Sequence, residues 1–276
     1  MIVVHHLNNS RSQRIPWLLE ELGVLYRLEQ HRRDGKTNLA PPELRAIHPL
    51  SKSPVIQDGD LTLAESGAII EYLVERYGAG RLVPQRGSNE HVRYLYWMHF
   101  AEGTMMLHMV ARLYLIRVGE AAIALRGRVE AMIGDELDLV EAELGRSAHL
   151  AGTEFSAADV QMTFPLEFAV YGGLLAERHV RVRDYLARMQ ARPDYRRAVE
   201  KGGAYAFDVK SAGDAAPFPC LGANRSYWPS RHAHLRPVSE PRSSIRSSSS
   251  RTSSNTKRPA TRESARTMHN SMCYLL

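Results

Sequence analysis

The sequence predicts a two-domain α+β fold, in which a small domain with a mixed sheet precedes an all-helical domain. The apolar and β-branched segment 2–7 is typical of a buried strand. Asp58-Gly59 separates two apolar stretches and indicates a β-hairpin. From Asn89 to about Lys201 the hydrophobic residues follow a helical period, and no segment has a strand pattern. The length of 276 residues allows two domains.

The elements of the first domain follow one another in the order βαβα-ββα, which favours a small domain with a mixed sheet. After the first strand, Asn8-Asn9-Ser10 indicates a turn, and a helix with one apolar face follows from Arg11 to Leu22. Gly23 is expected to end this helix. The remaining elements are a strand over 24–30, a short helix over 41–48, hairpin strands at 55–56 and 61–63, and an amphipathic helix over 65–77.

The domain boundaries follow from these patterns. We expect the first domain over residues 1–80, a linker over 81–88 and the helical domain over 89–207. Long helices are expected over 90–118 and 120–144. A further helix is expected to begin at Ser156, because Ser156 and Asp159 have the spacing of a structural N-cap pair.

The C-terminal segment 208–276 has a different composition. Between residues 239 and 266 it consists largely of Ser, Arg, Thr and Pro, and its apolar residues are too few to offset the entropy of ordering. We therefore expect a disordered tail. Two interpretations stay open: an extension without function, such as a frameshift or read-through product, or a phosphorylated or polyanion-binding arm.

The positive charge of the chain belongs to this tail. Residues 211–276 contain 10 basic and 3 acidic residues, whereas residues 1–210 contain 26 basic and 27 acidic residues. A basic groove for nucleic acid is therefore not expected in the folded part. A polyanion-binding function of the tail would instead require binding that depends steeply on salt and is lost when the residues after Val209 are deleted.

The two cysteines, Cys220 and Cys273, also lie in the tail. The rest of the chain therefore has no disulfide, cysteine zinc site or cysteine nucleophile, and thiol chemistry there requires a thiol brought by a ligand. The sequence has no apolar run long enough for a transmembrane helix, and its first residues do not resemble a signal peptide. A cytoplasmic protein without membrane or nucleic-acid partners is expected.

Three blocks of sequence resemble cytosolic glutathione S-transferases, in particular a fungal and bacterial branch that includes a yeast enzyme. They occur in the family's order and spacing, and the resemblance covers about residues 1–206 and is strongest before residue 80. The blocks are 6–14 with 17–23, 40–44 with 47–56, and 63–73. The resemblance implies a thioredoxin-like glutathione-binding domain, a helical domain with a second-substrate pocket, and a homodimer.

The resemblance also implies residues that bind glutathione. Ser66, at a helix start, would bind the γ-glutamyl carboxylate, which suits the free N–H groups and the dipole there. Glu65 would accept from the γ-glutamyl ammonium; for both residues the alternative is an ordinary helix start. Pro54 would be cis, so that the backbone of Ser53 meets the cysteinyl part. Lys52 would pair with the glycyl carboxylate or be a plain surface lysine. Ser51 stands where relatives often have glycine, which restricts the backbone.

Ser10 is the catalytic candidate, because serine transferases place their activating hydroxyl between the first strand and the first helix. A free thiol has a pKa of about 8.5, and the thiolate is the nucleophile. A hydroxyl that donates to the sulfur favours the thiolate, so Ser10 would be a hydrogen-bond donor. Its alternative role is an N-cap. Ser12 is the competing hydroxyl, and Asn9 is a further donor.

The second substrate is expected against the first long helix of the helical domain. An apolar, methionine-containing stripe there suits varied ligands, although such a stripe is also typical of a core or a dimer contact. The stripe consists of Tyr94, Trp97, Met98, Ala101, Met105 and Met106. The histidines, among them His5, His6, His91, His99 and His108, lack the spacing of a metal site, so no metal is expected.

The function predicted from this resemblance is a detoxification activity: conjugation of the glutathione thiolate, stabilised by a serine hydroxyl, to electrophilic small molecules. Glutathione is the co-substrate. Two alternatives stay open. One is a glutathione-dependent peroxidase or reductase activity on the same site. The other is a binding or regulatory protein that keeps the transferase fold without catalysis.

Overall fold

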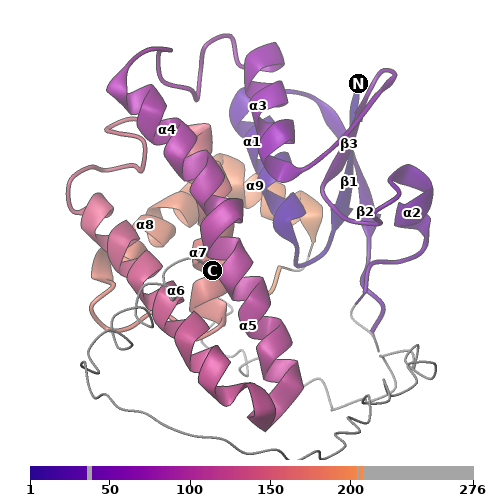
Figure 1. The fold of residues 1–276 in the computed structure, drawn as a ribbon. Helices are drawn as coiled ribbons and strands as arrows, with labels where there is room; N and C mark the ends of the chain where they lie inside the picture. Colours follow the sequence, from indigo (N-terminus) through magenta and orange to yellow (C-terminus); the bar gives the residue numbers. More distant parts are fainter. Residues whose placement is uncertain (36–38, 204, 208–276) are drawn as a thin grey trace, which may run out of the picture. The chain divides into compact units, whose positions relative to one another are not determined.

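The computed structural model describes residues 1–35, 39–203 and 205–207 (Figure 1). The expectation of a disordered tail over 208–276 lies outside these residues, as does the choice between its two interpretations. None of the helices in the described part of the chain is long and apolar enough to span a membrane.

The first part of the chain forms a four-stranded mixed sheet. Strand β1 pairs in parallel with β2, while β1 with β3 and β3 with β4 pair antiparallel, in the order β2-β1-β3-β4. The predicted fold class, a thioredoxin-like domain followed by a helical region, is therefore confirmed. The strands are β1 Ile2–Leu7, β2 Tyr26–His31, β3 Val55–Asp58 and β4 Leu61–Ala64.

The register of the sheet brings three chain segments to one edge. His5, near the end of β1, lies opposite Val55, the first residue of β3. Val55 in turn lies opposite Ala64, the last residue of β4. The segment after β1, the segment before β3 and the segment after β4 therefore leave the sheet on the same side.

Helices α1 and α3 of the first part follow the two strands, β1 and β4, that end at this edge. Gly23 ends α1 with a φ of 66°, a left-handed conformation that glycine adopts without a steric cost, so its predicted role is confirmed. The predicted helix over 11–22 divides into a 3₁₀ turn and an α-helix. The helices are η1 Arg11–Gln13, α1 Arg14–Leu22, α2 Glu43–Ile47 and α3 Ser66–Tyr77.

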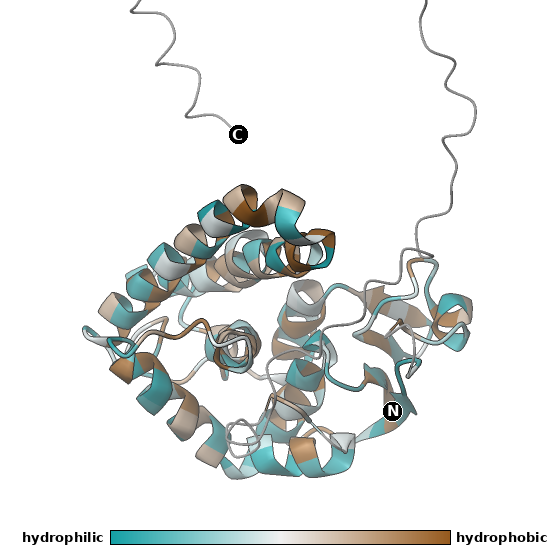
Figure 2. Cartoon of the chain, turned by 90° about the horizontal axis from the view of Figure 1, so that it is seen from below, coloured by the Kyte–Doolittle hydropathy of each residue, from teal (hydrophilic) through white to brown (hydrophobic). Residues whose placement is uncertain are grey.

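The rest of the described chain is helical, as expected. The predicted long helix over 90–118 is interrupted by a π-helical segment, η2, over Ala101–Met106. In Figure 2 the helices change colour every few residues, as amphipathic helices do. The elements are α4 Asn89–Phe100, η2, α5 Leu107–Val118, η3 Gly119–Ala122, α6 Ile123–Leu144, α7 Ala157–Tyr171, α8 Val180–Ala191 and α9 Pro193–Gly202.

Helix α7 lies at the centre of the packing. Its residues from Ala157 to Ala169 are all buried, which is the behaviour of a helix enclosed on every side. Helices α1, α3, α4 and α8 contact it, and α9 packs against α1. The helical region therefore closes over the helices that cover the sheet, and α7 carries side chains toward the edge described above.

The start of α7 is fixed by the predicted N-cap pair. Ser156 and Asp159 form a capping box, in which an Asp159 carboxylate oxygen accepts from the backbone N–H of Ser156 at 2.8 Å. The other oxygen accepts from the hydroxyl of Tyr185 at 2.8 Å and from the N–H of Leu150 at 3.1 Å. The prediction is confirmed, and the same carboxylate also ties α8 and the preceding loop to α7.

Replacing Asp159 by alanine is expected to destabilise the fold by about 3 kcal/mol, because four buried donors, two of them on Ser156, lose their acceptor. Chemical denaturation of Asp159→Ala and wild type measures the difference. Asp184→Ala, at an exposed position of α8, is the matched control and should stay within about 0.5 kcal/mol of wild type. Equal stabilities of the two variants would contradict this role.

Candidate functional site

Ser10 lies just beyond β1, at the edge where the three segments meet. Its Oγ accepts from the backbone N–H of Ser12 at 3.1 Å, which caps the short helix η1. The same Oγ lies 2.8 Å from the Oγ of Ser12. Ser10 is 6% exposed, whereas Ser12 is fully buried. The N-cap role of Ser10 is therefore present in the structure, and the exposed fractions favour Ser10 over Ser12 for contact with a ligand.

His6, on β1, contacts the second of these two serines. Its Nδ1 is 2.9 Å from the Oγ of Ser12, and the side chain is 3% exposed. Burial, with a smaller contribution from the nearby His31, lowers the pKa of His6 to about 4. The imidazole is therefore neutral near pH 7 and carries one ring proton.

Arg14 is a buried charge at the first turn of α1. Its Nη1 donates to a carboxylate oxygen of Glu102, in η2, at 2.6 Å and to the Oγ of Ser66, at the start of α3, at 3.0 Å. Its guanidinium lies 5.1 Å from the ring centre of Phe164 in α7. Burial lowers the pKa of Arg14, and the Glu102 carboxylate opposes this shift. Nε and Nη2 are buried without a hydrogen-bond partner among the described residues.

The hydroxyl of Ser66 is surrounded by donors. Besides Nη1 of Arg14, the side-chain amide of Gln161 in α7 donates to it, at 3.4 Å. With both acceptor positions of the oxygen used, the hydroxyl proton remains for a further acceptor. The first N–H groups of α3 also lack partners within the helix. This site therefore offers donors to an anion.

The residues before and after the strands at this edge have uncommon backbone conformations. Glu65, which is exposed and precedes α3, has a φ of 71°, and Asn9 has a φ of 51°. Ser51, where relatives often have glycine, has a φ of 52°. Positive φ is rare for residues other than glycine and is frequent at functional sites. Each of these three residues directly precedes a predicted site residue.

The segment before β3 has the geometry that the resemblance implies. The Ser53–Pro54 peptide bond is cis, so this prediction is confirmed. The hydroxyl of Ser53 donates to the backbone carbonyl of His5 at 2.7 Å, which joins this segment to β1. Lys52 is exposed.

The predicted second-substrate residues lie in the hydrophobic core. Tyr94, Trp97 and Met98 are each 3% exposed, and Met105 is fully buried. Ala101 and Met106 lie in the same core. This burial favours the alternative that the stripe is packing rather than a binding surface.

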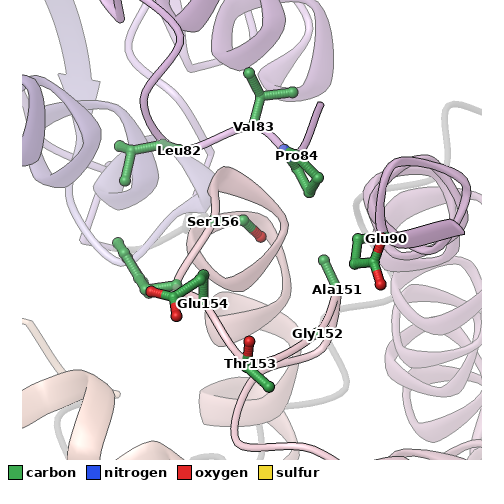
Figure 3. Close-up of a pocket in the computed structure, with 10 residues that line it drawn as sticks. Leu82, Val83, Pro84, Glu90, Ala151, Gly152, Thr153, Glu154 and Ser156 are labelled. Carbon is green, nitrogen blue, oxygen red and sulfur yellow. The ribbon is translucent and has the colours of Figure 1, made fainter. Parts of the chain in front are cut away.

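A described pocket of about 230 Å³ lies elsewhere (Figure 3). It is lined by the segment before α4, the start of α4 and the loop before α7, and none of the residues predicted to bind glutathione or the second substrate lines it. Its lining includes Leu82, Pro84, Glu90, Thr153 and Glu154.

Two of the histidines considered for a metal site, His5 and His108, contact other side chains. His5 lies 3.3 Å from His31 and 3.2 Å from Gln57, measured between their side-chain nitrogen or oxygen atoms, and His108 pairs with Glu136. Within the described ranges no group of three or more His, Cys, Asp and Glu side chains is arranged to hold a metal. The absence of a metal stays a prediction.

Sequence reasoning did not assign roles to Arg14, Glu102 or Gln161. Arg14 precedes Leu18 by four residues and so lies on the buried face of α1, which is a signal for a buried and paired arginine. Glu102 and Gln161 come from distant helices, and nothing local to either residue identifies its partner.

Comparison with known proteins identifies the family of this chain. Residues 1–75 match the model of the glutathione S-transferase N-terminal domain. Glutathione S-transferase 3 of Schizosaccharomyces pombe is 35% identical over 215 residues, which cover 73% of this chain and 88% of that protein. The chain belongs to the glutathione S-transferase family. The resemblance seen in three sequence blocks is therefore confirmed.

Solved structures of glutathione transferases have the same fold. One from Actinobacillus pleuropneumoniae is 32% identical, with a TM-score of 0.71 over 80% of this chain and 99% of that chain. The transferase URE2P6 from Phanerochaete chrysosporium, in complex with oxidized glutathione, is 23% identical, with a TM-score of 0.61 over 73% of this chain and 96% of that chain. At 23% identity, the similarity to this second structure shows a shared fold only.

The low pKa of His6 makes stability depend on pH. Between pH 6.5 and pH 4 the unfolded chain binds a proton at His6 that the folded protein does not. Stability is therefore lost as the pH falls through this window, by about 3 kcal/mol from this group. Denaturation at both ends of the window should show a smaller loss in His6→Leu than in wild type. The exposed His99→Leu is the control, and an unchanged loss in His6→Leu would contradict the prediction.

Proposed function

We propose that this member of the family conjugates the glutathione thiolate to electrophilic small molecules, with glutathione bound along one edge of the sheet. The observation that carries the proposal is the convergence of Ser10, the cis Pro54 and Ser66 at this edge. These segments are far apart in the sequence, and each offers a group that suits a different part of glutathione.

The γ-glutamyl end is assigned to the start of α3. The hydroxyl proton of Ser66 and the free N–H groups of the helix suit its carboxylate. The buried guanidinium of Arg14 adds positive charge next to that hydroxyl, at 3.0 Å. Glu65 is the acceptor proposed for the ammonium group, and its exposed side chain is accessible to one.

The rest of glutathione is assigned to the segment before β3 and to Ser10. The backbone of Ser53 would pair with the cysteinyl part in the manner of an added strand, and the exposed Lys52 would pair with the glycyl carboxylate. Ser10 would donate to the sulfur and so favour the thiolate over the thiol. Asn9 and Ser12 remain the runners-up for this contact.

The second substrate is proposed to bind beside the sulfur, so that proximity and thiolate formation together raise the rate. The burial of Tyr94, Trp97, Met98 and Met105 supports a core role for that stripe, so the residues that hold the electrophile are left open. A homodimer and a cytoplasmic location stay predictions. Peroxidase or reductase activity would use the same thiolate.

Replacing Ser10 by alanine is expected to lower kcat about 10- to 100-fold, because the thiolate loses its hydrogen-bond donor. Glutathione affinity should change little. Turnover of an aryl halide and calorimetric titration with glutathione measure the two effects. Ser88→Ala is the matched control, because Ser88 caps α4 with a bond of 3.1 Å to the N–H of His91 and is not assigned to the site. A greater loss in Ser12→Ala than in Ser10→Ala would contradict the assignment.

Replacing Ser66 by alanine is expected to weaken glutathione binding about 10- to 100-fold, because a hydrogen bond to a charged group is lost. At saturating glutathione, kcat should stay near the wild-type value. Ser66→Thr keeps a hydroxyl and should retain most of the affinity. If Ser66→Ala binds glutathione as wild type does, the assignment of the γ-glutamyl end is wrong. Glutathione binding without turnover in the wild-type protein would support the non-catalytic alternative.

A further inference from the structure

A chain of three buried side chains leads from β1 to the proposed catalytic hydroxyl. The Nδ1 of His6 lies 2.9 Å from the Oγ of Ser12, which lies 2.8 Å from the Oγ of Ser10. These contacts cross from the strand to the first helical turn. The role of these hydrogen bonds depends on which atom is the donor in each of them.

We propose that His6 is a positioning residue, which donates its Nδ1–H to Ser12 so that Ser12 donates to Ser10 and Ser10 donates to the glutathione sulfur. The inference rests on the proposed function, in which Ser10 contacts the sulfur. It adds His6 and Ser12 to the thiolate-binding machinery, although neither residue touches the ligand in this arrangement.

Counting protons gives this direction. A serine hydroxyl has one proton and two acceptor positions. If Ser10 donates to the sulfur, the 2.8 Å contact between the two hydroxyls requires Ser12 to be the donor. The proton of Ser12 is then used in this bond, in place of the 3.1 Å contact of its hydroxyl with the backbone carbonyl of Leu7, and its oxygen accepts from the N–H of Leu7 at 3.1 Å. Only one acceptor position is left for His6, so its Nδ1 must carry the proton.

The opposite direction makes His6 a base, and the chemistry disfavours it. In that arrangement Ser10 donates to Ser12 and Ser12 donates to His6, so a proton from the thiol would end on the imidazole. Burial holds the pKa of His6 at about 4, whereas a free thiol has a pKa of about 8.5. The transfer would be uphill by more than four pKa units. In our proposal no proton moves along the chain, because each hydrogen stays on its own atom.

The surroundings of His6 limit its freedom to rearrange. The ring is 3% exposed, and the end of α9 lies against it. A Cβ atom added at Gly202 would be 3.2 Å from the Nε2 of His6 and 3.1 Å from the side-chain oxygen of Gln13. Such a contact is tighter than an ordinary van der Waals contact. The absence of a side chain at Gly202 therefore allows α9 to close over the ring and hold its orientation.

The effect expected on the thiol is modest. Hydrogen bonds in a chain polarise one another, by roughly 10–30% per bond. Losing the donation from Ser12 should therefore raise the pKa of the bound thiol by about half a unit, which lowers the thiolate fraction about threefold near neutral pH.

The test measures the pKa of the bound glutathione thiol from the ultraviolet absorbance of the thiolate as a function of pH. His6→Leu and Ser12→Ala should each raise it by about half a unit, and the double variant should raise it no further, because both break the same chain. His6→Asn offers an amide N–H close to the position of Nδ1 and should restore a value near wild type. His99→Leu is the matched control, since His99 is exposed.

A second measurement uses the unaltered protein and so does not depend on how the variants fold. Nitrogen NMR of the imidazole, with glutathione bound, should show the proton of His6 on Nδ1. A proton on Nε2 would overturn the proposal, as would an unchanged thiol pKa in His6→Leu. If Ser10→Ala also leaves the thiol pKa unchanged while glutathione still binds, the proposed role of Ser10 fails instead. If glutathione does not bind the wild-type protein, the proposed function fails.

Discussion

The pairing of Arg14 with Glu102 is the interaction on which the rest of the site depends. A guanidinium that is 1% exposed must be paired, because an uncompensated buried charge costs several kcal/mol. Its partner lies in η2, 88 residues further along the chain, so the pair joins α1 to the helical region. Arg11 binds the other carboxylate oxygen at 2.8 Å, and the carboxylate thus holds both ends of the first helical turn. The position of Ser66 follows, because it accepts from the same guanidinium nitrogen.

Ser66 and Ser10 are prepared for a ligand in the same way. In each case a backbone or side-chain N–H of the protein already donates to the hydroxyl oxygen, at 3.0 Å for Ser66 and 3.1 Å for Ser10. An oxygen whose acceptor positions are used directs its proton elsewhere. Groups fixed in this manner need little rearrangement when an anion binds, which is the condition for strong electrostatic stabilisation. The hydrogen bonds that cap the helices and pair the buried charge therefore also orient the hydroxyl groups of the site.

The sequence predicted the parts of this structure that depend on local signals. The strand at 2–7, the turn at Asp58-Gly59, the end of α1 at Gly23 and the cap at Ser156 are each specified by neighbouring residues. The bond between Arg14 and Glu102 depends on how two distant helices meet, so local patterns do not predict it. The stripe from Tyr94 to Met106 shows a different limit. A core and an adaptable pocket use the same residue types, and only the packing of α7 against α4 distinguishes them.

The π-helical segment η2 has a consequence for the surface of its helix. A π-turn contains one residue more than an α-turn, so each such insertion rotates the following helix by about 100° relative to the preceding one. The faces of α4 and α5 are therefore out of phase, although the two helices are continuous with η2. Alignments of relatives that lack this extra residue need a one-residue gap near Glu102. A comparison that omits the gap would assign the buried face of α5 to the wrong residues.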